Sequence, residues 1–324
     1  MKDDFFAEAL DYHALPFPGK IGMSLTKPVS TQRDLSLTYT PGVGSPCLEI
    51  NKNKDNVWKY TNKGNTVAII TDGTAVLGLG DIGPEAALPV MEGKVVIFKK
   101  FADIDAYPLC MQFDKNVDDD EYVERFKRAV ECLEPCLGGI NLEDIKAPYC
   151  FKLQSDLDEK MGIPVFHDDQ DGTGIIITAG IMNALELNGK KVEEIQILIN
   201  GAGAAGIACA RLLLGFGVRK EQIFLCDSKG LVTTGREINQ YKQEFAQDAE
   251  NMDLARAIKE KDVFIGVSVK NVLSQDMVRS MNTGAIVFAV ANPIPEIMPE
   301  AAIEAGAFVV GSGRSDYDNQ VNNS

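Results

Sequence analysis

Short apolar runs bounded by turn residues recur along the second half of the chain. Helical spacing is seen between these runs, at 207–216, 254–260 and 274–279. Strands without polar alternation, separated by helices, are typical of a parallel sheet that is covered on both faces. The pattern therefore predicts a doubly wound α/β domain. The predicted strands are Ile195–Asn200, Gln222–Asp227, Asp262–Ser268, Ala285–Val290 and Ala307–Gly311.

The first half of the chain has a less regular pattern. The apolar runs Thr66–Thr71 and Lys94–Lys99 predict strands. Residues 118–133 have the period of an amphipathic helix, and its acidic first turn suits the positive end of a helix dipole. This half is also predicted to be α/β.

A glycine-rich turn follows the predicted strand Ile195–Asn200 and opens a helix. Its glycines allow a tight turn and a close approach of the backbone to a pyrophosphate, whose charge then lies at the helix N-terminus. Asp227 ends the next strand, 21 residues after the last glycine, where an acid accepts hydrogen bonds from the adenosine ribose. Lys229 nearby suits a 2′-phosphate, so both NAD and NADP stay open. The predicted cofactor turn consists of Gly201, Ala202, Gly203, Ala204, Ala205 and Gly206.

Adjacent carboxylates occur in two loops next to apolar runs, where we expect strand ends. Glu143 and Asp144 form one pair, and Asp168 and Asp169 form the other, after His167. Carboxylate oxygens are the ligands that Mg²⁺ and Mn²⁺ prefer, although such pairs are also common in solvated loops and helix caps. For His167 we expect a structural, hydrogen-bonded role.

Composition and charge narrow the class of protein. The chain has 324 residues, enough for about two domains, and a net charge of −15 that disfavours nucleic acid and anionic membranes as partners. Seven cysteines at scattered spacings do not suggest a disulfide framework, and we expect Cys132, Cys136 and Cys150 to be small buried hydrophobes rather than a soft-metal site. The N-terminus does not resemble a signal peptide, so a cytoplasmic location is expected.

Several motifs, in order from about residue 20 to the last residue, resemble the malic enzymes of the short bacterial type. They include Tyr39-Thr-Pro-Gly-Val, Thr71-Asp-Gly-Thr-Ala, Met91-Glu-Gly-Lys94, Gly139-Ile-Asn-Leu-Glu-Asp-Ile145, His167-Asp-Asp-Gln and Ala291-Asn-Pro293. The resemblance implies a homodimeric enzyme that oxidises and decarboxylates L-malate to pyruvate and CO₂, with NAD or NADP and Mg²⁺ or Mn²⁺. We predict a catalytic domain over 1–160 and a Rossmann domain over 161–324.

The resemblance also assigns roles to individual residues. Lys94 matches the general base, Tyr39 the general acid, and Asp168 a carboxylate that helps to polarise the lysine. From the residues alone, Lys94 is more readily interpreted as a lysine that reaches solvent and Tyr39 as a packing aromatic, so neither is identifiable as catalytic without the resemblance. The matched metal ligands are Glu143, Asp144 and Asp169, and the matched substrate contacts are Lys94, Asn292 and Asn323.

The sequence departs from the family pattern at four places. Ala75 stands where larger relatives have a substrate-binding arginine, which leaves Arg314 and Arg33 as candidates for that role. Asp171 replaces a more usual His or Gln, and Asp318 a more usual Pro. Relatives continue beyond Ser324 with a further strand and helices, so the Rossmann domain is expected to be truncated.

Other functions fit parts of the same pattern. A malolactic-type enzyme would keep NAD bound and return lactate, while an enzyme of the amino-acid dehydrogenase type would leave the acidic pairs without a use. A dinucleotide-binding fragment without catalytic activity is the third possibility, because a Rossmann turn specifies binding and not chemistry.

Overall fold

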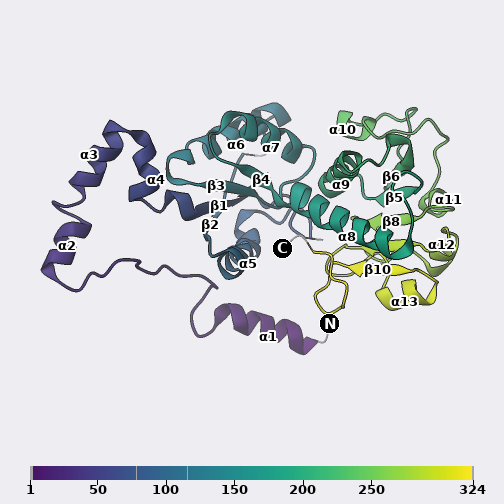
Figure 1. The fold of residues 1–324 in the computed structure, drawn as a ribbon, viewed down its shortest axis with the longest axis horizontal. Helices are drawn as coiled ribbons and strands as arrows, with labels where there is room; N and C mark the ends of the chain where they lie inside the picture. Colours follow the sequence, from purple (N-terminus) through teal and green to yellow (C-terminus); the bar gives the residue numbers. More distant parts are fainter. Residues whose placement is uncertain (1–2, 78, 115, 323–324) are drawn as a thin grey trace. The chain divides into compact units, whose positions relative to one another are not determined.

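The computed structural model describes residues 3–77, 79–114 and 116–322. The chain forms two compact units, each assembled from separate stretches of sequence (Figure 1). Unit 1 contains the chain up to Asp72, Gly83–Leu142 and Ser155–Val165. Unit 2 contains Gly73–Ile82, Glu143–Gln154 and the chain from Phe166 onward. The predicted domain boundary between residues 160 and 161 stays a prediction.

Unit 1 is built around a sheet whose described strands have the order β2-β1-β3-β4. β1 pairs in parallel with β2 and with β3, so their carboxyl ends lie at one edge of the sheet. β1 confirms the strand predicted at Thr66–Thr71. The four strands are β1 (Thr66–Thr71), β2 (Asp105–Cys110), β3 (Gly139–Leu142) and β4 (Val165–His167).

Helix α5 (Pro84–Ala102) covers β1 and β2, and it corrects the prediction of a strand at Lys94–Lys99. The run of valine, isoleucine and phenylalanine after Lys94 is apolar without alternation, a pattern that a buried helix shares with a buried strand. Met91 and Val95, one helical turn apart, pack against Ile69 of β1. Lys94 lies between them in sequence and is therefore carried on a largely buried stretch of helix.

The other helices of this part of the chain include the predicted amphipathic helix, which is confirmed as α6. Its N-cap Asp118 accepts a hydrogen bond from the main-chain N–H of Glu121 at 2.9 Å. The helices are α1 (Asp3–Ala14), α2 (Gln32–Thr38), α3 (Gly44–Lys52), α4 (Val57–Tyr60), α6 (Asp119–Glu131) and α7 (Tyr149–Lys160).

Unit 2 contains a second sheet whose described strands have the order β10-β9-β8-β5-β6-β7. All pairs are parallel except β6 with β7, and the chain reverses its direction of progress across the sheet at β5. In doubly wound sheets, ligands bind outside the carboxyl ends of the strands at such a switch point. The strands are β5 (Ile197–Asn200), β6 (Ile223–Asp227), β7 (Gly230–Leu231), β8 (Val263–Gly266), β9 (Ile286–Ala289) and β10 (Val309–Ser312).

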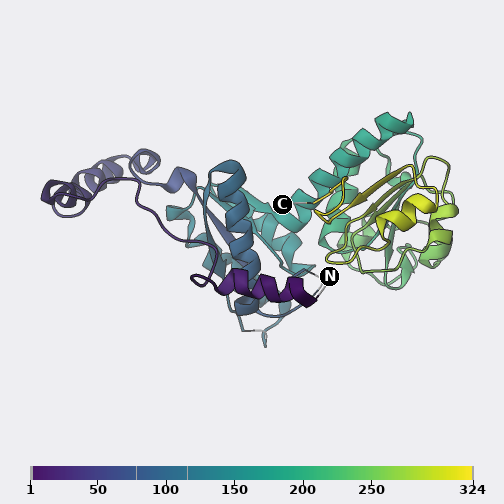
Figure 2. The same ribbon diagram turned by 90° about the horizontal axis from the view of Figure 1, so that it is seen from below.

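Helices lie on both faces of this sheet, as Figure 2 shows from below, which confirms the predicted doubly wound fold. Leu198 and Val287 pack into a core with residues of α11–α13. The neighbouring Phe288 faces the other way, toward Gly180 of α8. The helices are α8 (Thr173–Asn188), α9 (Ala204–Gly215), α10 (Gln240–Gln243), α11 (Leu254–Ala257), α12 (Gln275–Arg279) and α13 (Pro299–Glu304).

The cysteines follow the sequence prediction only in part. All seven are free thiols, and Cys150 is buried as expected. Cys132 and Cys136 are exposed, which corrects their prediction as buried hydrophobes, because they lie at and beyond the C-terminal end of α6 rather than on its buried face. Among the described helices, none combines the length and the apolar character needed to cross a membrane.

Candidate functional site

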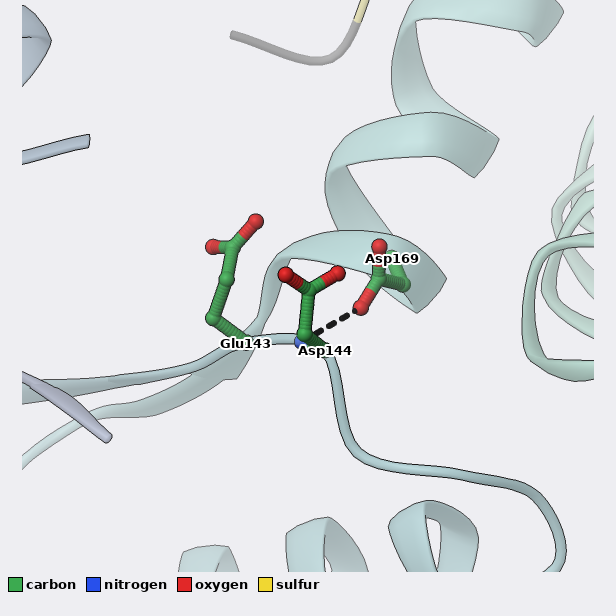
Figure 3. Close-up of side chains that lie close together, drawn as sticks. All are labelled: Glu143, Asp144 and Asp169. Atoms are coloured by element: carbon green, nitrogen blue, oxygen red, sulfur yellow. Dashed lines mark hydrogen bonds between the residues drawn. The ribbon is translucent and has the colours of Figure 1, made fainter. Parts of the chain in front are cut away.

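Three carboxylates converge where β3 and β4 end. Glu143 and Asp144 follow β3 directly, and Asp169 follows β4 in a π-helical turn, η4 (Asp168–Gly172), that leads into α8. One oxygen from each of the three side chains lies within 4.8 Å of the others, and Figure 3 shows the carboxylates close together. Sequence reasoning placed both acidic pairs at strand ends, and the structure brings these three side chains together.

The main chain around Asp144 fixes this arrangement. Asp144 adopts a left-handed conformation with φ of 53°, and its N–H donates to Oδ2 of Asp169 at 2.9 Å (Figure 3). Its carbonyl oxygen accepts from the N–H of Ala75 at 3.0 Å, and the N–H of Lys146 donates to Oγ1 of Thr74 at 3.0 Å. The loop after β1, which contains the Ala75 position, is therefore held directly against the loop that carries two of the carboxylates.

Asp171 belongs to the framework of the π-helical turn. Its Oδ2 accepts a short hydrogen bond from the side chain of Gln154 and a longer one, 3.4 Å, from the N–H of His167. Gln170 in turn donates to the carbonyl of Cys150 at 3.2 Å. Irregular π turns are frequent at functional sites, and here side-chain hydrogen bonds hold the turn that presents Asp169.

His167 is buried in a structural position, but the expectation that its ring is hydrogen-bonded is wrong. Neither ring nitrogen has a hydrogen-bond partner among the described residues, and Nδ1 lies 3.9 Å from Oδ2 of Asp169. Burial lowers the pKa of His167 to about 4, against the opposing effect of Asp171 and Asp168. The ring is therefore a neutral packing group at neutral pH.

The carboxylate triad fits a hard divalent cation. Glu143 and Asp144 are buried and Asp169 is partly exposed, so the group combines low solvent access with an open side. Oxygen-only donors suit Mg²⁺ and Mn²⁺, which also bind water and substrate oxygens. Converging carboxylates repel one another in a poorly hydrated site, and a bound cation would relieve that repulsion.

The glycine turn between β5 and α9 has the geometry needed to bind a phosphate. Gly201 has a φ of 125°, and a Cβ there would lie 2.4 Å from the carbonyl oxygen of Val267. In contrast, a Cβ on Gly203, the N-cap of α9, would meet no described atom within 4 Å. Open space at the N-terminus of a 12-residue helix is a cradle for an anion, and it fits the pyrophosphate of a dinucleotide.

Asp227 ends β6 beside this turn, as predicted, but it already has strong partners. Nη2 of Arg236 lies 2.8 Å from both of its carboxylate oxygens, and Nζ of Lys242 lies 2.8 Å from Oδ2. Burial raises the pKa of Asp227, but the hydrogen bonds from Lys242, Arg236 and the N–H of Lys229 outweigh burial and lower the pKa to about 2. Both basic partners lie further along the chain, and no motif signalled them.

The remaining predicted residues are distributed over the two units. Tyr39 is the C-cap of α2 and is 71% exposed, and Lys94 on α5 is 8% exposed, both in unit 1. Asp168 is buried in η4, and Asn292 is exposed after β9, both in unit 2. Asn323 lies outside the described residues.

The two candidate arginines have different surroundings. Arg314 is paired with Asp316 through Nε at 2.8 Å and Nη2 at 2.5 Å. Arg33 is exposed on α2. The guanidinium of Arg314 would therefore have to exchange Asp316 for a substrate carboxylate.

Sequence reasoning missed a buried carboxylate at the switch point. Glu296 is fully buried, and its Oε1 accepts from the N–H of Ser268 at 2.8 Å while Oε2 accepts from the N–H of Ala291 at 3.2 Å. The hydroxyl of Ser268 accepts from the side chain of Asn200, the last residue of β5, at 2.8 Å. Glu296 thus links the loops after β8 and β9, and Ser268 extends the link to β5. A single glutamate in a loop carries no sequence signal for this role.

The fold and the glycine turn define an α/β protein of the dinucleotide-binding class. Two family models match the chain: the malic enzyme N-terminal domain over residues 18–158 and the malic enzyme NAD binding domain over residues 170–323. The chain belongs to the malic enzyme family.

Individual relatives agree in family but differ in length and cofactor. The bifunctional malic/malolactic enzyme of Bacillus subtilis is 52% identical over 98% of this chain and 76% of its own length. The NADP-dependent malic enzyme of Escherichia coli is 50% identical, and the chain spans only 42% of it. The crystal structure of the NAD-dependent malic enzyme from Thermotoga maritima superposes with a TM-score of 0.88 at 42% identity, covering 100% of this chain and 83% of that one.

Proposed function

We propose that this chain catalyses the metal-dependent oxidative decarboxylation of L-malate to pyruvate and CO₂, with reduction of NAD or NADP. The observation that carries the proposal is the carboxylate triad of Glu143, Asp144 and Asp169, which lies in the same unit as the glycine turn. A dinucleotide fold alone specifies binding, whereas an oxygen-only metal site adds a means of handling a hydroxy acid.

The triad would hold Mg²⁺ or Mn²⁺. When bound, such an ion supplies Lewis-acid stabilisation of negative charge on substrate oxygens, and the nicotinamide cofactor accepts the hydride from C2 of malate. The chain's contribution is to bring three acceptor groups together, with Asp144 and Asp169 linked by a hydrogen bond.

Lys94 is the proposed general base, which takes the proton from the C2 hydroxyl as hydride leaves. A base that is largely shielded from water keeps that proton transfer from competing with solvent. Lys94 is buried on the long helix α5, whose neighbouring residues Met91 and Val95 pack in the core with β1, and this restricts its position. Asp168 is proposed as the carboxylate that helps to polarise the amine.

Tyr39 is the proposed general acid, which returns a proton to C3 after CO₂ has left. Asn292 and Asn323 are proposed to bind the substrate through their amides, and Lys94 contacts it as well. These roles follow from the match of these positions to the family motifs.

The central experiment is a malate assay with Mn²⁺ and with NAD⁺ and NADP⁺ in parallel. We expect malate-dependent formation of reduced cofactor, and a decrease of ~10²–10⁴-fold in kcat for Lys94→Ala. Lys100→Ala, at an exposed position of the same helix, is the control and should keep normal activity. If the unaltered chain forms no reduced cofactor with either dinucleotide, the proposal fails. Cofactor binding without Mn²⁺-dependent malate binding would instead identify a dinucleotide-binding fragment.

The malolactic reaction is a second candidate, favoured by the name of the Bacillus subtilis relative, which is described as bifunctional. In that reaction the same chemistry is followed by return of the hydride to pyruvate, so that lactate leaves and no net reduced cofactor accumulates. Quantifying pyruvate and lactate after malate turnover separates the two: pyruvate supports oxidative decarboxylation, and lactate the malolactic reaction.

We also propose that the chain forms a homodimer through its N-terminal helices. No residue of α2, α3 or α4 is buried, although these helices carry large apolar side chains. Apolar surface of this extent marks an interaction site, and a second copy would cover it and enclose the exposed Tyr39. Light scattering should report a dimer for the unaltered chain, and a monomer for Leu37→Asp combined with Leu48→Asp. The side chains concerned are Leu35, Leu37, Leu48, Trp58 and Tyr60.

A further inference from the structure

The carboxylate of Asp227 has no acceptor site left for a ribose hydroxyl. A carboxylate accepts about four hydrogen bonds. Oδ1 accepts from the N–H of Lys229 at 2.9 Å and from Arg236 at 2.8 Å, and Oδ2 accepts from Arg236 and Lys242 at 2.8 Å each. A hydroxyl that donates to Asp227, as in NAD-specific Rossmann sites, would have to displace one of these donors.

The arrangement around Asp227 is built into the fold rather than formed by mobile surface side chains. Nη1 of Arg236 also donates to the carbonyls of Leu231 at 2.8 Å and Gly230 at 3.2 Å, which anchors the guanidinium to β7. The side chains of Asp227 and Arg236 are 11% and 13% exposed, and that of Lys242, from α10, is 24% exposed. Asp227 therefore serves to hold two cations at the end of β6.

The local charge at this position has the opposite sign to that of the whole chain. Two cationic side chains surround one carboxylate, which leaves a net positive charge. The exposed side chain of Lys229, two residues after Asp227, adds a further positive charge. Lys242 uses one of its three N–H donors on Asp227, so donors remain for an anion. In Rossmann folds the group that lies beyond this strand end is the 2′ position of the adenosine ribose.

We propose that Lys242 and Lys229, with Arg236 holding Asp227 in place, form a subsite for the 2′-phosphate of NADP, so that this chain prefers NADP to NAD. The inference rests on the dinucleotide binding that is part of the proposed function, and it deepens that function by naming the cofactor. Relatives at similar identity include both NADP-dependent and NAD-dependent enzymes, so their names leave the choice open.

The test is isothermal titration calorimetry with two probes, adenosine 2′,5′-bisphosphate and adenosine 5′-monophosphate, which differ only in the 2′-phosphate. Neither malate, metal ion nor turnover is needed. We expect the bisphosphate to bind at least about tenfold more tightly, because charge-assisted hydrogen bonds to the phosphate are gained. The difference should decrease as salt is added, because Lys229 is exposed.

Variants locate the effect. Lys242→Gln should weaken the bisphosphate about tenfold and change the monophosphate less than about twofold. Lys191→Gln, an exposed lysine remote in sequence from this strand end, is the matched control and should change neither. Thermal denaturation of each variant shows whether the fold is retained. Lys229→Gln provides a second, exposed test position.

Equal affinities of the unaltered chain for the two probes would overturn the inference, and so would loss of both affinities together in Lys242→Gln with an unchanged thermal midpoint. These results are independent of the malate assay. Malate oxidation with NAD⁺ alone refutes the subsite and leaves the proposed function intact. Preference for the bisphosphate without malate turnover would support the subsite and refute the proposed function.

Discussion

Gly206 and Gly201 are in backbone contact across the cofactor turn: a Cβ on Gly206 would lie 1.7 Å from the carbonyl oxygen of Gly201. No side chain fits at Gly206 unless the strand end and the helix start move apart. Gly203, three residues earlier, differs: a Cβ there would meet no described atom within 4 Å. Gly206 is therefore required by backbone packing, whereas Gly203 leaves space for a ligand.

This difference gives a matched pair of variants. Gly206→Ala should lower the free energy of unfolding by about 1–3 kcal/mol, because the added methyl group forces the backbone apart. Gly203→Ala should leave stability within about 0.5 kcal/mol of the unaltered chain, because the methyl group points into open space, but should weaken dinucleotide binding. Urea denaturation and titration with NADH and NADPH measure the two effects. Normal cofactor affinity in a folded Gly203→Ala protein would contradict the role given to this turn.

The metal triad leads to a prediction that does not depend on turnover. Asp169→Asn keeps an oxygen that accepts from the N–H of Asp144 but removes a negative charge from the site. We expect the Kd for Mn²⁺, measured by electron paramagnetic resonance, to increase at least about tenfold. Asp158→Asn, at an exposed position on α7, is the control. Unchanged Mn²⁺ affinity in Asp169→Asn would show that the triad is not the metal site.

Removal of the Glu296 carboxylate should lower the stability of the loops that follow β8 and β9. Glu296→Ala leaves the partly buried N–H groups of Ser268 and Ala291 without their acceptor, at a cost of about 1 kcal/mol for each group. Glu296→Gln keeps one acceptor oxygen and should cost less. Thermal denaturation ranks the variants, with the exposed Glu221→Ala as control. A cost for Glu296→Gln equal to that of Glu296→Ala would show that the accepted hydrogen bonds are not what matters.

The ion pairs of Asp227 predict a pH dependence of stability. The pKa of Asp227 is lowered to about 2 in the folded chain, so its ionised form is favoured by folding. Its contribution is fully present above the ordinary value of 3.8 and is lost as the pH falls through the folded value. The stability difference between the unaltered chain and Asp227→Asn, from urea denaturation, should therefore shrink from about pH 6 to about pH 3. A difference that is constant over this range would exclude the ion pairs as its source.

The regular features of the chain were predictable because their signals are local. The parallel strands of the second sheet, the helix α9 and the acid at Asp227 follow from periodicity and spacing over a few tens of residues, whereas the two-residue antiparallel strand β7 was not predicted. The acidic pairs were recognised because each follows an apolar run at an expected strand end. What brings Glu143 and Asp169 together is the pairing of strands, which strand-end position already implies.

The features that were missed depend on contacts between distant positions. Lys94 lies on a helix because Met91 and Val95 pack on β1 and β2, and a run of four apolar residues does not distinguish that from a strand. The partners of Asp227 lie 9 and 15 residues away, and Glu296 meets Ser268 across 28 residues. The ring of His167 lacks a hydrogen bond among the described residues. Its neighbours are set by tertiary packing, which cannot be predicted from a local residue pattern.

The way in which the chain passes back and forth between its two units has a consequence for synthesis on the ribosome. Unit 2 includes Gly73–Ile82 and Glu143–Gln154, which emerge well before the sheet of β5 to β10 exists. The ring of Phe151 packs against that of Tyr241 at a centroid distance of 4.2 Å, and this contact forms only after another 90 residues have been made. The acidic loop at Glu143 and Asp144 gains its contact with Asp169 once another 25 residues have been made, after its own strand has been translated. Because unit 2 combines early and late stretches of the chain, we expect it to reach its final packing only in a late stage of folding.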